Sequence, residues 1–517
     1  MSRIGQGVGA NFLGYLLQVG TNVLLVPLFL RSWGKEIFGE WLILSAAVGY
    51  FSLLDLGVQS YVVNRLSQSY SQGKLEEFHR DLHSGMRVIQ FIILIGFVGL
   101  CVLVGFVPLD GLLNLRVSSV MSIRLTVFFL GSLILFSAVF MGLIGGLYRA
   151  TGAFARGTMI VNVFRILRVS MSVGLLFLSS PMWVLAMSWL LFDFVVALFI
   201  VYDLRRFRPD IHLMSWRGDI SHGLTLLGPS VFFLLISVAN TINLQGTILV
   251  LGFFGGSVAV AQFGTLRTLS NFVFQAGQLV SVVLWPEMTM LDAQGNREHF
   301  ERMWKLNVKL FSSFALFCAV FLEFAGKEIY LVWTQRRLEF DAVALDILLF
   351  QMVIMAFWCS AALPLLASNR HRAYSWLMLG NAVTTVLLCL FFVPVWGVRG
   401  VVLSSLLADI VWSFVPIPFL VSTHLGFGAW VYWKEVVLPG AAIGIGLGIL
   451  LKWVLVRLIP GFLADEMWFS FSLMIFLAPA YALAVYLLWL TEKERNTVRT
   501  ALGSLCNLWS HLRREGL

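Results

Sequence analysis

Charged residues are scarce in this chain. Asp, Glu, Lys and Arg make up 12% of its 517 residues, whereas hydrophobic residues make up 59%. A soluble domain would carry about twice that share of charge. The five cysteines are scattered and fit neither a disulfide framework nor a metal site. The net charge of +9 does not indicate nucleic-acid binding, because most of the cations fall in short loops. The composition predicts a polytopic membrane protein.

The sequence also lacks the signatures of an enzyme. No nucleophile–base pair, metal-ligand spacing or phosphate-binding loop stands out. A membrane polymerase or ligase of sugars would generally need a large loop outside the membrane, and the longest loops here have only about twenty residues. We therefore expect no enzymatic activity, no metal and no cofactor.

Apolar segments of about 20 residues, long enough to cross a bilayer as a helix, recur along the chain. We expect fourteen, at 8–30, 41–63, 86–106, 123–147, 159–179, 182–202, 226–250, 258–286, 306–326, 344–367, 373–393, 398–420, 436–458 and 468–490. An even number places both termini on one side. Lys and Arg are more frequent in the loops of that side, which predicts that it is the cytoplasm.

Two short motifs occur twice. Q-G-K-L-E-E-F-H-R from Gln72 and Q-G-N-R-E-H-F-E-R from Gln294 share five of nine positions at an offset of 222 residues. L-L-F-D-F-V from Leu190 returns as L-L-A-D-I-V from Leu406, offset by 216. Both offsets pass over six spans, so the repeats share one orientation in the membrane. We expect an all-α protein with two pseudo-symmetric six-helix lobes at 1–202 and 223–421, two C-terminal helices at 436–490 and a cytoplasmic tail at 491–517.

Polar side chains share one face in several of these spans. In the span at 258–286, the polar residues are Arg267, Asn271, Gln275 and Gln278. They are spaced i, i+4, i+8 and i+11, so they lie on one face of a helix. A charge at the depth of Arg267 costs at least about 2.5–3.5 kcal/mol unless it faces a cavity or a partner. We expect a water-filled cleft between the lobes, lined by Arg267, Asn271, Gln275, Gln278, Gln18, Asn22, Asp55, Gln59 and Asn243. The alternative is ordinary hydrogen bonding between helices, with Arg267 as a buried structural residue.

Other buried charges are expected to hold helices together. Arg165 and Arg168 lie one turn apart in the span at 159–179, and Asp193 lies at a similar depth in the next span. This predicts a structural ion pair between Asp193 and one of the arginines. Asp409 is the repeat equivalent of Asp193, but the sequence offers no arginine to pair with it.

The repeat also predicts a gate. Arg65 and Glu287 are 222 residues apart, so they are equivalent positions of the repeat. Residues of opposite charge are therefore expected at equivalent helix ends on the cytoplasmic side. Such a pair would draw the lobes together when the cleft opens outward. The alternative is that Arg65 anchors a helix end and that Glu287 is a solvated loop acid.

The segment F-G-E-W-L-I-L-S-A-A-V-G-Y-F-S-L-L-D-L-G-V-Q-S-Y-V-V-N-R-L, from Phe38 to Leu66, resembles the polysaccharide transporter (Wzx-like) branch of the multidrug/oligosaccharidyl-lipid/polysaccharide exporter superfamily. Its most specific residues are Phe38-Gly39, Leu56-Gly57 and Arg65, and the helix number and two-lobe repeat extend the resemblance over the whole chain. The resemblance implies a flippase in a bacterial inner membrane. By alternating access it would move an undecaprenyl-pyrophosphate-linked oligosaccharide to the outer leaflet, for O-antigen, capsule or exopolysaccharide synthesis.

Within that interpretation, the cleft would replace the water that hydrates the sugar hydroxyls, and Arg267 would hold the pyrophosphate. Peptidoglycan-precursor flippases carry arginines in the first helix, where this chain has Gln18 and Asn22, which disfavours that role. The alternative is a cation-coupled multidrug exporter of the same superfamily, with Asp55 as the proton or sodium site. The expected partners are the lipid-linked oligosaccharide and membrane lipids. A polysaccharide polymerase and its chain-length machinery are further candidates.

Overall fold

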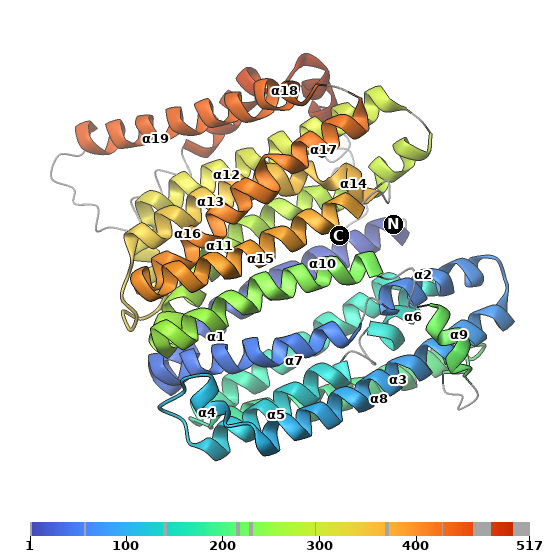
Figure 1. Cartoon of the computed structure of the whole chain (residues 1–517). Coiled ribbons are helices and arrows are strands. Elements are labelled where there is room, and N and C mark those ends of the chain that lie inside the picture. The colour runs from blue at the N-terminus through green and yellow to red at the C-terminus, as the bar shows by residue number, and fades with distance from the viewer. Residues whose placement is uncertain are drawn as a thin grey trace, which may run out of the picture. The chain divides into compact units, whose positions relative to one another are not determined.

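The computed structural model describes residues 3–55, 58–137, 142–213, 218–226, 231–294, 296–367, 372–426, 428–458 and 477–499. These residues form helices joined by short loops and contain no strand (Figure 1). Eleven helices among them are long and apolar enough to cross a membrane. The predicted class of an all-α polytopic membrane protein is therefore confirmed, while the number fourteen stays a prediction.

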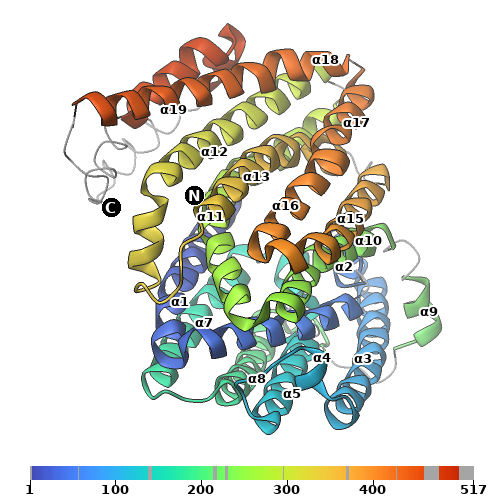
Figure 2. The ribbon, with the colours of Figure 1, turned by 60° about the vertical axis from the view of Figure 1, so that its left-hand side comes forward.

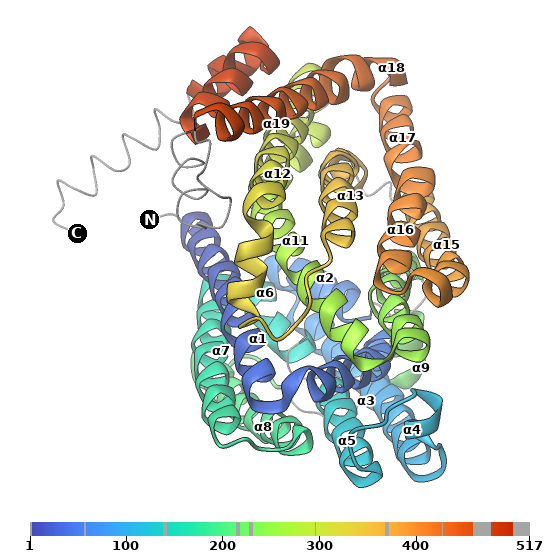
Figure 3. The same ribbon diagram turned by 90° about the vertical axis from the view of Figure 1, so that its left-hand side faces the viewer.

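Two long helices each bend sharply at a glycine, and each contains one expected span together with a part of a neighbouring one. α1 runs from Arg3 to Gly49 and bends at Gly34 (φ 77°, ψ 175°), and α11 runs from Thr247 to Ala293 and bends at Gly256 (φ 77°, ψ 178°) (Figure 3). Glycine adopts a positive φ at little cost because it has no Cβ. The two bends are 222 residues apart, the same offset as the repeated loop motif, although the boundaries of the two lobes stay a prediction.

The chain forms two compact units. The first unit contains Met1–Thr268, Leu331–Ala344 and Ser375–Ala408, and the second contains Leu269–Tyr330, Leu345–Tyr374 and Asp409–Leu517. Besides α1 and the first part of α11, the first unit contains α2 (Val58–Ser71), α3 (Leu75–Phe106), α4 (Leu109–Leu112), α5 (Val120–Ser137), α6 (Gly145–Ala150), α7 (Phe154–Phe177), α8 (Met182–Phe207), α9 (Ile220–Thr225), α10 (Val231–Thr241), most of α15 (Arg372–Trp396) and nearly all of α16 (Val398–Asp409). Within it α5 lies beside α8, and α1 beside α7 (Figure 2).

The residues Phe38, Gly39 and Glu40 hold the first unit together at the bend of α1. A Cβ on Gly39 would come within 1.8 Å of the carbonyl oxygen of Ser257, so only glycine allows α11 to approach this closely. Phe38 stacks on Phe29 at 5.5 Å between ring centroids. The fully buried Glu40 accepts hydrogen bonds of 2.8–3.0 Å from the backbone N–H groups of Arg116, Val117 and Ser118. Phe38 and Gly39 therefore pack the helices of this unit, and Glu40 beside them holds the loop before α5. Leu56 and Gly57, the second specific pair of the family resemblance, lie outside the described residues.

The second unit contains the rest of α11, α12 (Arg297–Trp333) as far as Tyr330, and most of α13 (Ala342–Ala361). It also contains α14 (Leu363–Ala367), α17 (Pro416–Leu425), α18 (Ala429–Tyr432), α19 (Leu438–Leu458) and the C-terminal residues 477–499. Here Asp409 has the partner that the sequence did not reveal. The amide of Gln351 on α13 donates a hydrogen bond of 2.7 Å to its carboxylate. An amide can satisfy a buried carboxylate without bringing a second charge.

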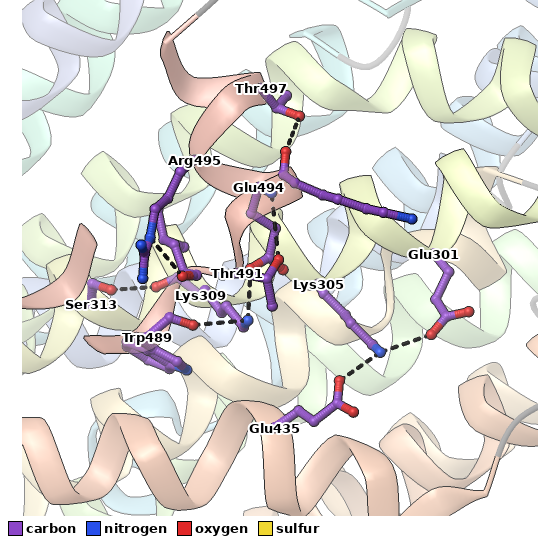
Figure 4. Close-up of polar contacts among 12 residues, drawn as sticks. Glu301, Lys305, Lys309, Ser313, Glu435, Trp489, Thr491, Glu494, Arg495 and Thr497 are labelled. Atoms are coloured by element: carbon purple, nitrogen blue, oxygen red, sulfur yellow. Dashed lines mark hydrogen bonds and ion pairs between the residues drawn. The ribbon is translucent and has the colours of Figure 1, made fainter. Parts of the chain in front are cut away.

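A buried ion pair ties the C-terminal residues of the second unit to α12 (Figure 4). Lys309 Nζ donates to Glu494 Oε2 at 2.8 Å and to the carbonyl oxygen of Trp489 at 3.1 Å. Both charged side chains are only 2% exposed. Glu494 also accepts from the backbone N–H of Thr491 at 2.7 Å, and its own N–H lies 3.4 Å from the Thr491 hydroxyl. The same carboxylate therefore closes a capping box and neutralises Lys309.

Candidate functional site

A cavity of about 390 Å³ lies within the first unit, between α1, α7, α8 and α11. Its polar lining consists of amide, hydroxyl and guanidinium groups, from Gln18, Thr21, Asn22, Arg165, Arg168, Ser172 and Thr268. Its aromatic lining consists of Phe29, Phe38, Trp41 and Trp189. None of the residues that line it is acidic among those that the structure describes.

The two arginines of the cavity differ in how their charge is balanced. Arg168 Nη1 lies 3.3 Å from Asp193 Oδ1, and its guanidinium lies over the ring of Trp189 at 4.9 Å. Asp193 also accepts a hydrogen bond of 2.9 Å from Ser137. Arg165 instead donates to the carbonyl oxygen of Gly14 at 2.7 Å, and no described carboxylate lies within ion-pair distance of it. The cavity therefore presents one positive charge that no acid neutralises.

Close packing of α7 on α1 positions Arg165. Asn162, one turn before it on α7, donates a hydrogen bond of 2.8 Å to the carbonyl oxygen of Ala10. A Cβ on Gly14 would come within 2.9 Å of the amide oxygen of Asn162, so the glycine leaves room for this contact. Two backbone carbonyls of α1 thus fix two polar side chains of α7, and Arg165 faces the cavity in a defined orientation.

Aromatic rings form a continuous wall on another side of the cavity. Phe29 lies 6.1 Å from Trp41, and Trp41 meets the edge of Trp189 at 5.4 Å between ring centroids. The indole nitrogen of Trp189 donates to Ser172 at 2.9 Å, which fixes the orientation of its ring. Flat apolar faces beside amides and a fixed cation suit a ligand with rings, hydroxyls and negative charge.

The structure places some of the predicted cleft residues in this cavity and others elsewhere in the first unit. Gln18 and Asn22 line it. Arg267 is next to the lining residue Thr268, but its Nη1 lies 3.4 Å from the carbonyl oxygen of Leu244 and its guanidinium lies 5.6 Å from the Phe263 ring centroid. Asn243 donates to Asn381 of α15 at 2.8 Å.

Three further predicted cleft residues belong to the second unit. Gln278 lies 3.7 Å from the sulfur of Cys359, and Asn271 is half-buried. The amide oxygen of Gln275 is buried and has no hydrogen-bond partner among the described residues. In the first unit, Gln59 packs against Gly142. The side chain of Asp55 lies outside the described residues, so its predicted role as an ion site stays a prediction.

The structure gives Arg65 two acidic neighbours on α3. Its Nε donates to Asp81 at 2.8 Å, and its Nη2 lies 3.4 Å from Glu77. The side chain of Glu287, its predicted gating partner, lies outside the described residues. The gate therefore stays a prediction.

Sequence reasoning did not select six of the polar and aromatic residues that line the cavity: Thr21, Phe29, Trp41, Ser172, Trp189 and Thr268. Trp41 stands inside the F-G-E-W segment and Thr21 precedes Asn22, so both carried a signal that could have been used. Ser172 continues the face of Arg165 and Arg168, at i, i+3 and i+7, so it also carried a signal. Trp189 joins the cavity through the packing of α8 on α7 and α1.

Comparison with known proteins connects this geometry to membrane transport. No protein-family model matches the chain. A candidate O-antigen transporter of Salmonella typhimurium is 19% identical over 435 residues, which cover 81% of this chain and 96% of that protein. The solved structure of lipid II flippase MurJ in an inward closed conformation matches with a TM-score of 0.70 and 14% identity, covering 92% of this chain and 98% of MurJ. The chain has the MurJ fold.

A multidrug resistance MATE family transporter of the MOP superfamily, in an inward-facing conformation, matches with a TM-score of 0.63 and 17% identity. That match covers 78% of this chain and 94% of the transporter. The resemblance to this superfamily that the sequence predicted is confirmed, as weak homology to the Salmonella protein and as a shared fold with MurJ and MATE transporters.

Proposed function

We propose that the protein is a flippase that moves an undecaprenyl-pyrophosphate-linked oligosaccharide from the inner to the outer leaflet of a bacterial inner membrane. The observation that carries the proposal is the cavity of the first unit, in which Arg165 supplies a positive charge that no described acid neutralises. The similarity to a candidate O-antigen transporter supports it independently.

The cavity residues can perform the two tasks that such transport requires. Sugar hydroxyls lose their hydrogen bonds to water inside a membrane protein, and the side chains of Gln18, Thr21 and Asn22 can replace them. The phosphate charge needs a cation, and a guanidinium binds phosphate oxygens in a bidentate manner. We assign this role to Arg165, and we propose Arg267, the residue selected from the sequence, which is next to the lining residue Thr268, as a second phosphate ligand. The volume is that of a site for a drug-sized ligand, so it holds part of the head group while the lipid tail stays in the bilayer.

A second candidate function is multidrug export coupled to a proton or sodium gradient. The match to a MATE family transporter favours it, and the aromatic wall would suit an apolar drug. The positive charge of Arg165 disfavours a cationic drug, because like charges repel at short range in a medium of low dielectric constant. In this alternative Asp55 would be the ion site.

The polysaccharide polymerase and its chain-length machinery would receive the substrate on the outer side, and both chain termini would lie in the cytoplasm. These assignments follow from the proposed function and from the distribution of Lys and Arg.

Deletion of the gene in its own host separates the two functions. A flippase predicts loss of the surface polysaccharide, accumulation of its lipid-linked precursor and unchanged drug sensitivity. A drug exporter predicts normal polysaccharide and higher drug accumulation. Restoration of polysaccharide by the wild-type gene, but not by an Arg165→Ala gene expressed at the same level, would connect the phenotype to the cavity.

A further inference from the structure

A second cavity, of about 540 Å³, lies in the first unit between α2 and α3. Every described residue that lines it carries a polar side chain. Six of these residues lie on one face of α2 and just beyond its end, and the seventh is Glu77 of α3. This lining differs from that of the Arg165 cavity, where aromatic rings form a wall.

Three amides form the centre of this lining. Asn64, Gln68 and Gln72 follow one another at intervals of four residues. The first two lie on α2, and Gln72 directly follows its last residue with its N–H still bonded to the carbonyl oxygen of Gln68 at 3.1 Å, so the three stand in a row. At 1.5 Å per residue the row is about 12 Å long. We call these three residues the amide row. A terminal amide donates and accepts hydrogen bonds, as a sugar hydroxyl does.

The opposite face of α2 fixes the amide row in place. Val62, Val63 and Leu66 are at most 1% exposed and belong to the hydrophobic core of the first unit, where they pack with Phe78 and Leu82 of α3. Because these apolar contacts set the rotation of α2, the row is presented to the cavity by a rigid element.

The residues that line the cavity carry little net charge, although they include Arg65. Outside the lining, the exposed Arg149 of α6 donates to the amide oxygen of Asn64 at 3.4 Å. The guanidinium of Arg65 is held by Asp81 at 2.8 Å and by Glu77 at 3.4 Å. Asp81 is fully buried and is held in turn by His222 of α9 at 2.6 Å. A guanidinium held by two carboxylates is a poor anchor for phosphate, so the residues that line the cavity favour a neutral ligand.

We propose that the amide row and its cavity form a recognition site for a neutral, hydroxyl-rich segment of the oligosaccharide, separate from the Arg165 cavity. The proposal rests on the proposed flippase function. With the predicted orientation, α2 ends on the cytoplasmic side, where the substrate is made. The site would select the sugar segment, and the Arg165 cavity would hold the phosphate.

Protection of a cysteine from labelling tests this site. Gln68→Cys is introduced after the five native cysteines have been replaced, and maleimide labelling is followed in membrane vesicles. Glu76→Cys, an exposed position on α3 outside the cavity, is the matched control. The oligosaccharide released from its lipid pyrophosphate should slow labelling of Gln68→Cys at least about fivefold and leave Glu76→Cys unchanged. Protection should persist when Arg165→Ala is added.

A transport measurement complements the labelling. Replacing all three amides of the row by alanine removes about three hydrogen bonds, which should raise the half-saturating substrate concentration about tenfold or more. Ser67→Ala and Ser71→Ala, on the same helix but outside the lining, should leave it unchanged.

Two results would overturn the inference: protection by undecaprenyl pyrophosphate alone, or unprotected Gln68→Cys in a protein that transports the lipid-linked oligosaccharide. The second result would leave the flippase function standing. Absence of transport by the wild-type protein would instead contradict the proposed function.

Discussion

Arg165 and Arg168 lie one helical turn apart on α7, yet among the described residues only Arg168 has a carboxylate partner. Arg165→Ala should therefore remove the free charge of the cavity and leave the ion pair intact. We expect transport to fall at least about tenfold, since a charge-assisted hydrogen bond is worth about 1.5–3 kcal/mol, with unchanged thermal stability in detergent. Arg165→Lys, which keeps the charge but loses the bidentate geometry, should restore part of the activity.

The same measurement on Arg267→Ala tests the second phosphate ligand that we propose. Wild-type transport by both alanine variants would remove the arginines from substrate binding. A loss confined to Arg267→Ala would place the phosphate away from the Arg165 cavity.

Asp193 is the acid that neutralises Arg168. Asp193→Asn would leave the arginine without its counter-charge and the Ser137 hydroxyl with a weaker acceptor. We expect a loss of about 1–3 kcal/mol of stability, the usual result of leaving a buried polar group unsatisfied. Thermal unfolding in detergent would show it as a lower midpoint. An Asp193→Asn protein that is as stable as the wild type but inactive would assign Asp193 to the transport mechanism.

A substitution of Gly39, which follows the bend of α1, tests how closely the helices of the first unit are packed. Gly39→Ala would place a methyl group 1.8 Å from the Ser257 carbonyl oxygen, so the backbone of α11 would have to move. Overpacking of this kind costs about 1–3 kcal/mol or more, and expression and thermal stability should fall. Gly20→Ala on the same helix is the control. Its new methyl group would meet no atom within 4 Å, and alanine favours a helix over glycine by about 0.5–1 kcal/mol. Equal stability of the two variants would contradict the packing described here.

The C-terminal residues 490–499 are held to α12 by the pair Lys309–Glu494. Glu494→Ala would leave a buried ammonium unpaired and should cost about 3–5 kcal/mol of stability, whereas the apolar double variant Lys309→Met with Glu494→Leu should recover most of it. Thermal unfolding of the two proteins in detergent distinguishes a structural pair from a transport element. A double variant that is stable but inactive would show that the charges act in transport.

The elements show what could be predicted from this sequence. The apolar spans and the repeat offset are local patterns, so they predicted the helical class, and the equivalent bends at Gly34 and Gly256 agree with the same offset. The periodicity of α1 also placed Gln18 and Asn22 on one polar face. Which helix faces which depends on contacts between residues distant in the sequence. The sequence predicted one cleft lined by both Gln18 and Asn243, whereas in the structure Gln18 lines a cavity with Arg165 of α7. The sequence also gave Asp409 no partner, because a glutamine such as Gln351 carries no charge to search for.

At the scale of the whole molecule, the fold that this chain shares with MurJ is combined with a cavity suited to one chemical task. A flippase must offer the head group hydrogen bonds and a counter-charge while the lipid tail remains in the membrane. The first unit holds both kinds of group in one cavity, on helices that buried contacts fix in place. Alternating access, with the cleft and the Arg65–Glu287 gate predicted from the sequence, would expose such a site first to one side of the membrane and then to the other.

The most direct test is translocation by the purified protein in liposomes. The vesicles contain a lipid-linked oligosaccharide with a fluorescent tag on its sugar, and an impermeant reductant that irreversibly destroys the fluorescence of the tag is added outside. With the wild-type protein, the loss of fluorescence should proceed beyond the outer-leaflet fraction until nearly all of the fluorescence is gone. In vesicles with the Arg165→Ala protein, the fraction of fluorescence lost should stay near the fraction lost in vesicles without protein. If the loss of fluorescence with folded wild-type protein stops at the outer-leaflet fraction, even with an ion gradient of either sign imposed, the proposed flippase function is contradicted.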